Sequence, residues 1–178
     1  MTTPEVTNNS ETVAPRSEWW GVLRDATVEV FSMMAAANVV VPHAGDDPVI
    51  VAEPADSSVL AYVTGMIGIA GAMRAVFSLR CSEATATKLA SHMLGVSEEE
   101  AAEQRSDAIG EICNMIAGHF KHQIGLGAGC TLSVPTVVMG GNYSIHCLEA
   151  GERIEFPAIY DSETLLITLD IRGSNQIR

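Results

Sequence analysis

The sequence predicts an α+β protein, arranged as a two-layer α/β sandwich. Helical patterns occur in two places along the 178 residues, and a run of strand patterns follows each of them. Hydrophobic residues make up 47% of the chain and charged residues 18%, so there is enough apolar material for a sizeable core. Residues 1–15 lack apolar periodicity, and we expect them to form a disordered tail before a single domain over 16–178.

The first half of the domain begins with a helix at 17–37, where apolar residues recur at three- and four-residue spacing. Turn-forming residues follow at 45–48. Strand patterns then occupy 49–53, 59–69 and 72–79. The last two predict a glycine-hinged hairpin. A membrane span is not favoured for their uncharged stretch, because it is too short and too rich in glycine.

The second half opens with a helix at 82–94, with Ser82 as its N-cap and Gly95 just after its end. Ser97 and Glu100 have the spacing of a capping box. A further helix is expected from Ser106-Asp107 to about residue 124, where a glycine-rich run breaks it. Strand patterns follow near 131–134, 142–149, 153–160 and 165–171.

The chain carries an acidic excess. It has 22 acidic and 10 basic residues, and its formal net charge is −12. A nucleic-acid-binding protein needs a basic face for the phosphates, and an anionic membrane surface repels an acidic chain. Both classes of partner are therefore excluded, while a positively charged protein surface is favoured. The four cysteines stand singly and no signal peptide is recognisable, so we expect reduced thiols in the cytoplasm.

The two longest helical patterns share a motif. Asp-Ala-x-x-Glu occurs at 25–29 and again, 82 residues later, at 107–111, and a Met and an Ala follow in register in both copies. Each copy is also followed by a Val-Pro pair, although at different distances. Two amphipathic helices could share a face pattern by chance, but burial does not require shared polar residues. An internal duplication is therefore favoured.

One side of the second repeat helix carries an unusual set of residues, which we call the 107–121 stripe: Asp107, Glu111, Asn114, Gly118 and Lys121. Relative to alanine, asparagine costs about 0.5 kcal/mol and glycine about 1 kcal/mol in a helix interior. The glycine also leaves space for a partner's backbone. These features indicate a contact surface, and a solvated polar helix face is the alternative.

These residues also resemble a known signature. Asp-xxx-Glu-xx-Asn at 107–114, the following residues to Gly118, and the run Cys-Thr-Leu-Ser-Val-Pro that ends at Pro135 are similar to the CheC/CheX/FliY family of chemotaxis phosphatases, and most of all to CheX. The resemblance covers about 18–172, although the spacing from Asn114 to Pro135 is slightly shorter than the usual pattern. It implies a mainly antiparallel sheet packed by the two repeat helices, and a homodimer.

The resemblance further implies an enzyme that accelerates loss of the aspartyl-phosphate from a CheY-like response regulator, in chemotaxis or related two-component signalling. Glu111 would dock on the regulator's active-site lysine, and Asn114 would orient the attacking water, so these two are the candidate catalytic residues. Asp107 and Gly118 are candidates for partner docking. Positioning suits phosphoryl transfer, which needs little covalent help from the protein.

No cofactor or metal ion is expected on this chain, since the Mg²⁺ would belong to the partner receiver domain. Ser32 stands where the second copy has Asn114, so the first repeat helix is expected to be an inactive half. The alternative function is a non-catalytic CheX-like module that docks a receiver domain or a signalling scaffold.

Three other features have simpler interpretations. His119 and His122 could share a metal ion, but a third ligand is not evident, so surface histidines are favoured. The glycines of 125–129 follow a helix and precede a strand, the wrong order for a dinucleotide fingerprint, which indicates a connector. Trp19-Trp20 is interpreted as a hydrophobic lid over the sheet.

Overall fold

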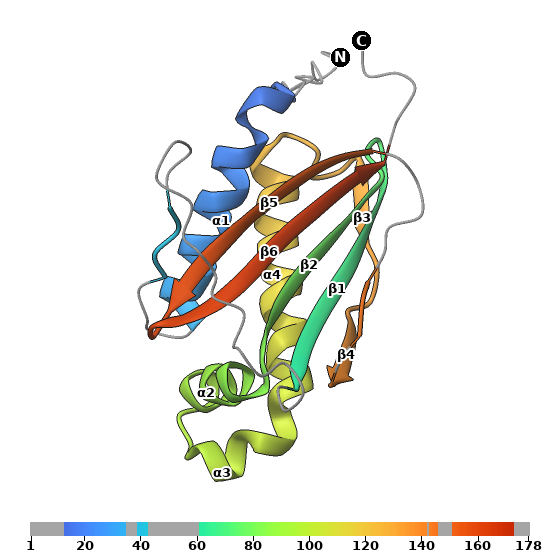
Figure 1. The fold of residues 1–178 in the computed structure, drawn as a ribbon. Helices are drawn as coiled ribbons and strands as arrows, with labels where there is room; N and C mark the ends of the chain where they lie inside the picture. The colour runs from blue at the N-terminus through green and yellow to red at the C-terminus, as the bar shows by residue number, and fades with distance from the viewer. Residues whose placement is uncertain (1–12, 35–38, 43–60, 142, 146–150, 173–178) are drawn as a thin grey trace, which may run out of the picture.

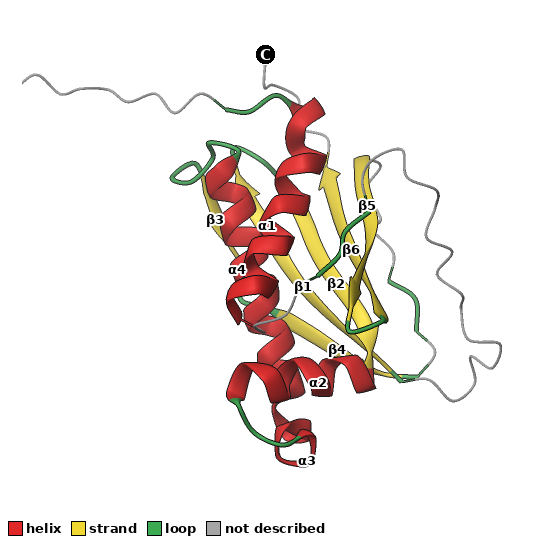
Figure 2. Ribbon diagram, turned by 90° about the vertical axis from the view of Figure 1, so that its left-hand side faces the viewer, coloured by secondary structure: helices red, strands yellow, loops and turns green. Residues whose placement is uncertain are grey.

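Two layers make up the computed structural model, which describes residues 13–34, 39–42, 61–141, 143–145 and 151–172. In it α1 (Trp19–Met34) and α4 (Arg105–Gln123) lie side by side on one face of an antiparallel sheet (Figures 1 and 2). The smaller helices α2 (Glu83–Leu94) and α3 (Glu98–Ala101) lie together at one end of the sandwich. The predicted α+β class and the packing of the sheet by the two repeat helices are thus confirmed.

The sheet of the described residues has six strands. In chain order they are β1 (Tyr62–Gly71), β2 (Ala75–Ser82), β3 (Cys130–Leu132), β4 (Thr136–Gly140), β5 (Gly151–Tyr160) and β6 (Glu163–Arg172). Their order in space is β3-β1-β2-β6-β5, and β4 pairs with β1 on the same edge as β3. Every pairing is antiparallel. The predicted hairpin is β1–β2.

Local signals set the ends of several elements. The Ser82 side chain accepts a hydrogen bond from the Thr85 N–H, and Gly95 ends α2 in the left-handed region with φ +67°. The predicted capping box of Ser97 and Glu100 is present at the start of α3. Short 3₁₀ turns at 16–18 and 102–104 precede α1 and α4.

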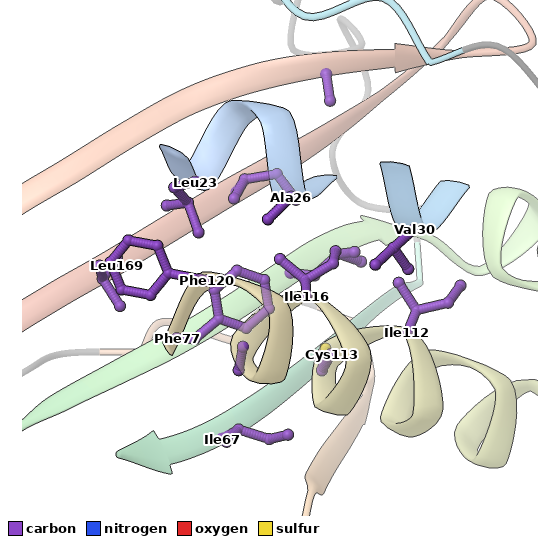
Figure 3. Close-up of a cluster of buried hydrophobic side chains, with 14 of the residues drawn as sticks. Leu23, Ala26, Val30, Ile67, Phe77, Ile112, Cys113, Ile116, Phe120 and Leu169 are labelled. Carbon is purple, nitrogen blue, oxygen red and sulfur yellow. The ribbon is translucent and has the colours of Figure 1, made fainter. Parts of the chain in front are cut away.

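Apolar side chains from both layers meet in a continuous core (Figure 3). Ile112, Ile116 and Phe120 of α4 are at most 1% exposed and lie between α1 and the sheet. Trp19 is equally buried, and its ring meets Phe120 edge-on with 5.9 Å between the centroids. Trp19 therefore lies in the joint between α1 and α4, whereas Trp20 packs over the sheet as predicted, with its ring 5.7 Å from that of Phe156 in β5.

The strand prediction was wrong at one edge of the sheet. Thr136–Gly140 forms β4, which was not predicted. Of the strand predicted at 142–149, residues 143–145 lie outside any strand, and residues 142 and 146–149 lie outside the described residues. The reason is that the first half of β1 needs a partner on this edge, and the nearest apolar segment, Val-Val-Met, supplies it. The strand predicted at 49–53 lies outside the described residues.

The start of the packed domain also differs from the prediction. Val13 and Ala14, assigned to the tail, pack against the core. The Ala14 N–H donates to the Ile124 carbonyl at 3.0 Å, and the Ala14 carbonyl accepts from the Trp19 indole at 2.9 Å. These two bonds hold Ala14 against the end of α4 and the start of α1. Residues 1–12 lie outside the described part. Within that part, none of the helices combines the length and apolarity that crossing a membrane requires.

Candidate functional site

The inner face of α4 lies directly on β1. A Cβ atom added to Gly65 would lie only 2.5 Å from the Cys113 Sγ and 2.8 Å from the Ile109 Cγ2, so the strand has no room for a side chain there. Cys113 and Ile109 are themselves fully buried. Glycine in β1 therefore sets how closely α4 approaches the sheet, and the opposite side of α4 faces outwards.

The 107–121 stripe occupies that outward side. Asp107 and Glu111 are exposed, and Asn114, Gly118 and Lys121 are partly buried. Among the described residues the side chains of Glu111 and Asn114 have no hydrogen-bond or ion-pair partner. The Lys121 ammonium instead donates to the Cys130 carbonyl at 2.9 Å. The acid and the amide are therefore available to a partner, whereas the lysine supports the fold.

An irregular segment of the sheet edge flanks the stripe. Between β3 and β4, the three residues 133–135 oppose only two residues of β1, Ile67 and Gly68, which makes a one-residue bulge. Ser133 fastens it: its N–H donates to the Gly68 carbonyl at 2.9 Å, and its hydroxyl oxygen accepts from the Gly68 N–H at 2.9 Å. We call residues 133–135 the edge bulge.

Two glycines locate the edge bulge relative to Asn114. A Cβ on Gly110 would lie 3.3 Å from the Pro135 Cβ, and one on Gly118 would lie 4.0 Å from the Leu132 Cδ1. Gly110 and Gly118 each stand one helical turn from Asn114 on the same side of α4. Asn114 therefore lies level with the edge bulge, between the contacts to Leu132 and Pro135.

Negative charge gathers before and along the start of α4. Six acids are exposed there: Glu98, Glu99, Glu100, Glu103, Asp107 and Glu111. The base among them, Arg105, turns towards α2, where its Nη1 lies 2.7 Å from the Glu83 Oε1. The acids therefore present an uncompensated negative surface beside Glu111. Acids also stabilise a helix N-terminus, so part of this pattern serves the helix itself.

The matching residues of α1 are arranged differently. Glu29, the counterpart of Glu111, lies 3.4 Å from the His119 Nδ1 and accepts from the Gln123 amide at 3.4 Å. Ser32, the counterpart of Asn114, is exposed. The acid of the first repeat is thus occupied by contacts to α4, and its amide is missing. This geometry is consistent with the expected inactive half.

Two other features weighed in the sequence lie near the end of α4: the pair His119 and His122, and the glycines that follow the helix. The described residues contain no group of three His, Cys, Asp or Glu side chains that could hold a metal ion. Gly125, with φ +77°, ends α4, and the next N–H, that of Leu126, donates to the Lys121 carbonyl at 3.1 Å. This is the geometry of a helix terminus, in agreement with the connector interpretation.

The sequence reasoning missed the edge bulge as part of the site. It took 131–134 as a regular strand, although Pro135 cannot donate to a ladder and is typical of edges and bulges. That proline was the available signal. The bulge leaves Val134 with 83% of its surface exposed.

Comparison with known proteins identifies the family. The family model described as "Chemotaxis phosphatase CheX" matches residues 63–158, which is 96 of the 178 residues and includes all of α4. No curated protein matches the chain significantly. The match confirms the resemblance seen in the sequence.

Several solved structures share the fold. The chemotaxis protein CheX from Vibrio vulnificus is 22% identical, with a TM-score of 0.68 over 89% of this chain and 99% of that one. CheX from Desulfovibrio desulfuricans is 21% identical, with a TM-score of 0.68 over 87% and 99%. The CheX of a CheX–CheY–BeF₃–Mg²⁺ complex from Borrelia burgdorferi is 19% identical, with a TM-score of 0.64 over 89% and 100%. With more than half of its length matched by the family model, the chain belongs to the CheX family of chemotaxis phosphatases.

Proposed function

We propose that this protein accelerates hydrolysis of the aspartyl-phosphate on a CheY-like receiver domain. The observation that carries the proposal is the placement of Glu111 and Asn114: both lie on the outward side of one helix, and neither side chain has a partner among the described residues. The family, described as a chemotaxis phosphatase, supports this class of reaction. The B. burgdorferi relative, crystallised with CheY, BeF₃ and Mg²⁺, supports this class of partner.

In this mechanism Asn114 positions the water. Its amide can accept from a water and donate to it without adding negative charge beside the phosphoryl group. The water oxygen attacks phosphorus in line, the bond to the aspartyl oxygen breaks, and inorganic phosphate leaves. Because α4 is fixed on the sheet at Gly65, the amide stands on a rigid element, which suits catalysis by positioning.

Glu111 has the docking role. An exposed carboxylate one turn from Asn114 can pair with a receiver lysine and hold the two active surfaces in register. The exposed acids before it increase the attraction for a basic surface and its association rate. Asp107 and Gly118 belong to the same docking surface in this proposal. The Mg²⁺ is the receiver's, and this chain binds no cofactor of its own.

We further propose that the protein acts in the cytoplasm, as a homodimer, in chemotaxis or related two-component signalling. The alternative function is a non-catalytic module that docks a receiver without hydrolysing it. The loss of the amide at Ser32 in the first repeat favours that alternative for half of the molecule only.

A phosphate-release assay tests the proposal. Each receiver domain of the source organism is phosphorylated, and its rate of phosphate loss is measured with and without this protein. We expect at least one receiver to lose phosphate many times faster in its presence. Binding without acceleration for every receiver would overturn the phosphatase and establish the docking module.

A further inference from the structure

The edge bulge presents an apolar side chain beside the candidate site. Val134 is 83% exposed, the highest value among the large exposed hydrophobics of the described residues. A bulge in an edge strand re-aims a side chain that regular pairing would place against the sheet. Here the extra residue turns a valine out into solvent next to a polar site.

The bulge is firmly held. Ser133 exchanges two hydrogen bonds with Gly68 of β1. Its hydroxyl also donates to the Val134 carbonyl at 3.0 Å. On the other side Pro135 has a fixed φ and lies against Gly110 of α4. The position of Val134 is therefore determined by contacts to both the sheet and the helix, which reduces the entropy lost when a partner binds there.

Val134 also stands level with Asn114. The contacts of Gly110 and Gly118 to Pro135 and Leu132 place the amide beside the middle of the bulge. A receiver whose phosphorylation site reaches Asn114 therefore comes close to the edge bulge, which carries Val134. The neighbouring stripe supplies charged and polar contacts, and a stable interface also needs an apolar residue that becomes buried near its centre.

We propose that Val134 is an apolar anchor of the receiver-docking surface, an inference that rests on the proposed function and extends it. Its partner is a receiver domain with an apolar side chain beside its phosphorylation site. Val134 contributes affinity and orientation, whereas Asn114 acts on the water. Removal of the valine therefore raises KM and leaves kcat unchanged.

The chain offers a matched control. Val40 is 62% exposed and bridges to Ile159 of β5, at the opposite edge of the sheet from β3 and β4. Val40→Ser and Val134→Ser make the same chemical change at two exposed positions, so neither is expected to disturb folding. Val134→Ile keeps the apolar contact and serves as the rescue.

The experiment measures receiver dephosphorylation kinetics, together with the affinity for the receiver loaded with beryllium fluoride and Mg²⁺. Val134→Ser should raise KM and Kd roughly tenfold, because burying a valine is worth about that factor. Val40→Ser and Val134→Ile should behave like the parent.

Each of the other outcomes contradicts the anchor role of Val134, the phosphatase proposal, or both. If Val134→Ser binds and turns over like the parent while Asn114→Ala is inactive, the anchor is wrong and the phosphatase stands. If the parent binds without accelerating hydrolysis and Val134→Ser weakens binding, the phosphatase is wrong and the anchor stands. A parent that neither binds nor acts on any receiver overturns both.

Discussion

Gly110 and Pro135 meet across the joint between the site helix and the sheet edge, with 3.3 Å between the Pro135 Cβ and the position of a Cβ on Gly110. This contact joins the two parts of the candidate site. Glu111 and Asn114 come from α4, and the edge bulge comes from the chain between β3 and β4. Their relative position depends on the absence of a side chain at 110.

A branched side chain at this position should disturb the joint. We expect Gly110→Val to lower the free energy of unfolding by about 1–3 kcal/mol, because its methyl groups must displace Pro135 or Val137 in a packed region. Urea unfolding followed by circular dichroism measures the change. A free energy within 0.5 kcal/mol of the parent would show that the joint adapts easily and does not fix the bulge.

Gly118, on the same side of α4, should respond in the opposite direction. A Cβ there would lie 4.0 Å from the Leu132 Cδ1, an ordinary contact, so alanine fits and favours the helix. We expect Gly118→Ala to raise the free energy of unfolding by about 0.5–1 kcal/mol. If a partner approaches closely at this glycine, as proposed, receiver affinity falls although the fold is more stable. Unchanged affinity in a stabilised variant would remove Gly118 from the docking surface.

Glu111 should control docking more than chemistry. We expect Glu111→Gln to raise KM roughly tenfold, about 1.4 kcal/mol, and to weaken the dependence of association on salt, because the amide keeps the shape but loses the charge. Glu29→Gln is the control, since this repeat-related acid contacts His119 and Gln123 instead of facing a partner. An equal loss in both variants would contradict a docking role specific to Glu111.

The buried thiols should make stability fall in alkali. Burial raises the pKa of Cys81 to about 12. Burial is also the main cause that raises the pKa of Cys113, which is raised further than that of Cys81, and the nearby Cys81 thiol is the second cause. An unfolded thiol loses its proton near pH 8.5, so above that pH the unfolded state binds fewer protons and unfolding becomes easier. Between pH 7 and 10 we expect a loss of about 1–2 kcal/mol for each thiol. Urea unfolding of Cys81→Ala should show a shallower decline, and a parent curve that is flat to pH 10 would contradict the account.

How far the sequence predicts the structure depends on the kind of signal. The helix that became α4 and the caps at Ser82 and Ser97 follow from signals within a few residues of each other, and the structure has them as predicted. The stripe with Glu111 and Asn114 also follows from helical spacing, once the helix is recognised.

The sheet edge could not be predicted in the same way. Whether Thr136–Gly140 is a strand depends on the first half of β1, more than 60 residues away in the chain, which pairs on that side with no other strand of the described residues. The bulge likewise depends on Gly68, because its N–H bonds to the Ser133 hydroxyl. Such long-range pairing leaves only a weak trace in the sequence, here a Val-Pro step before a short apolar run.

Asn114→Ala tests the central claim most directly. Phosphate loss from a phosphorylated receiver is followed with the parent, with Asn114→Ala, and with Ser32→Ala as the control in the repeat-related position. If Asn114 orients the water, its variant should lose acceleration by about a hundredfold or more and bind the receiver within about twofold of the parent, whereas Ser32→Ala should match the parent. An Asn114→Ala variant that removes phosphate as fast as the parent would contradict the mechanism.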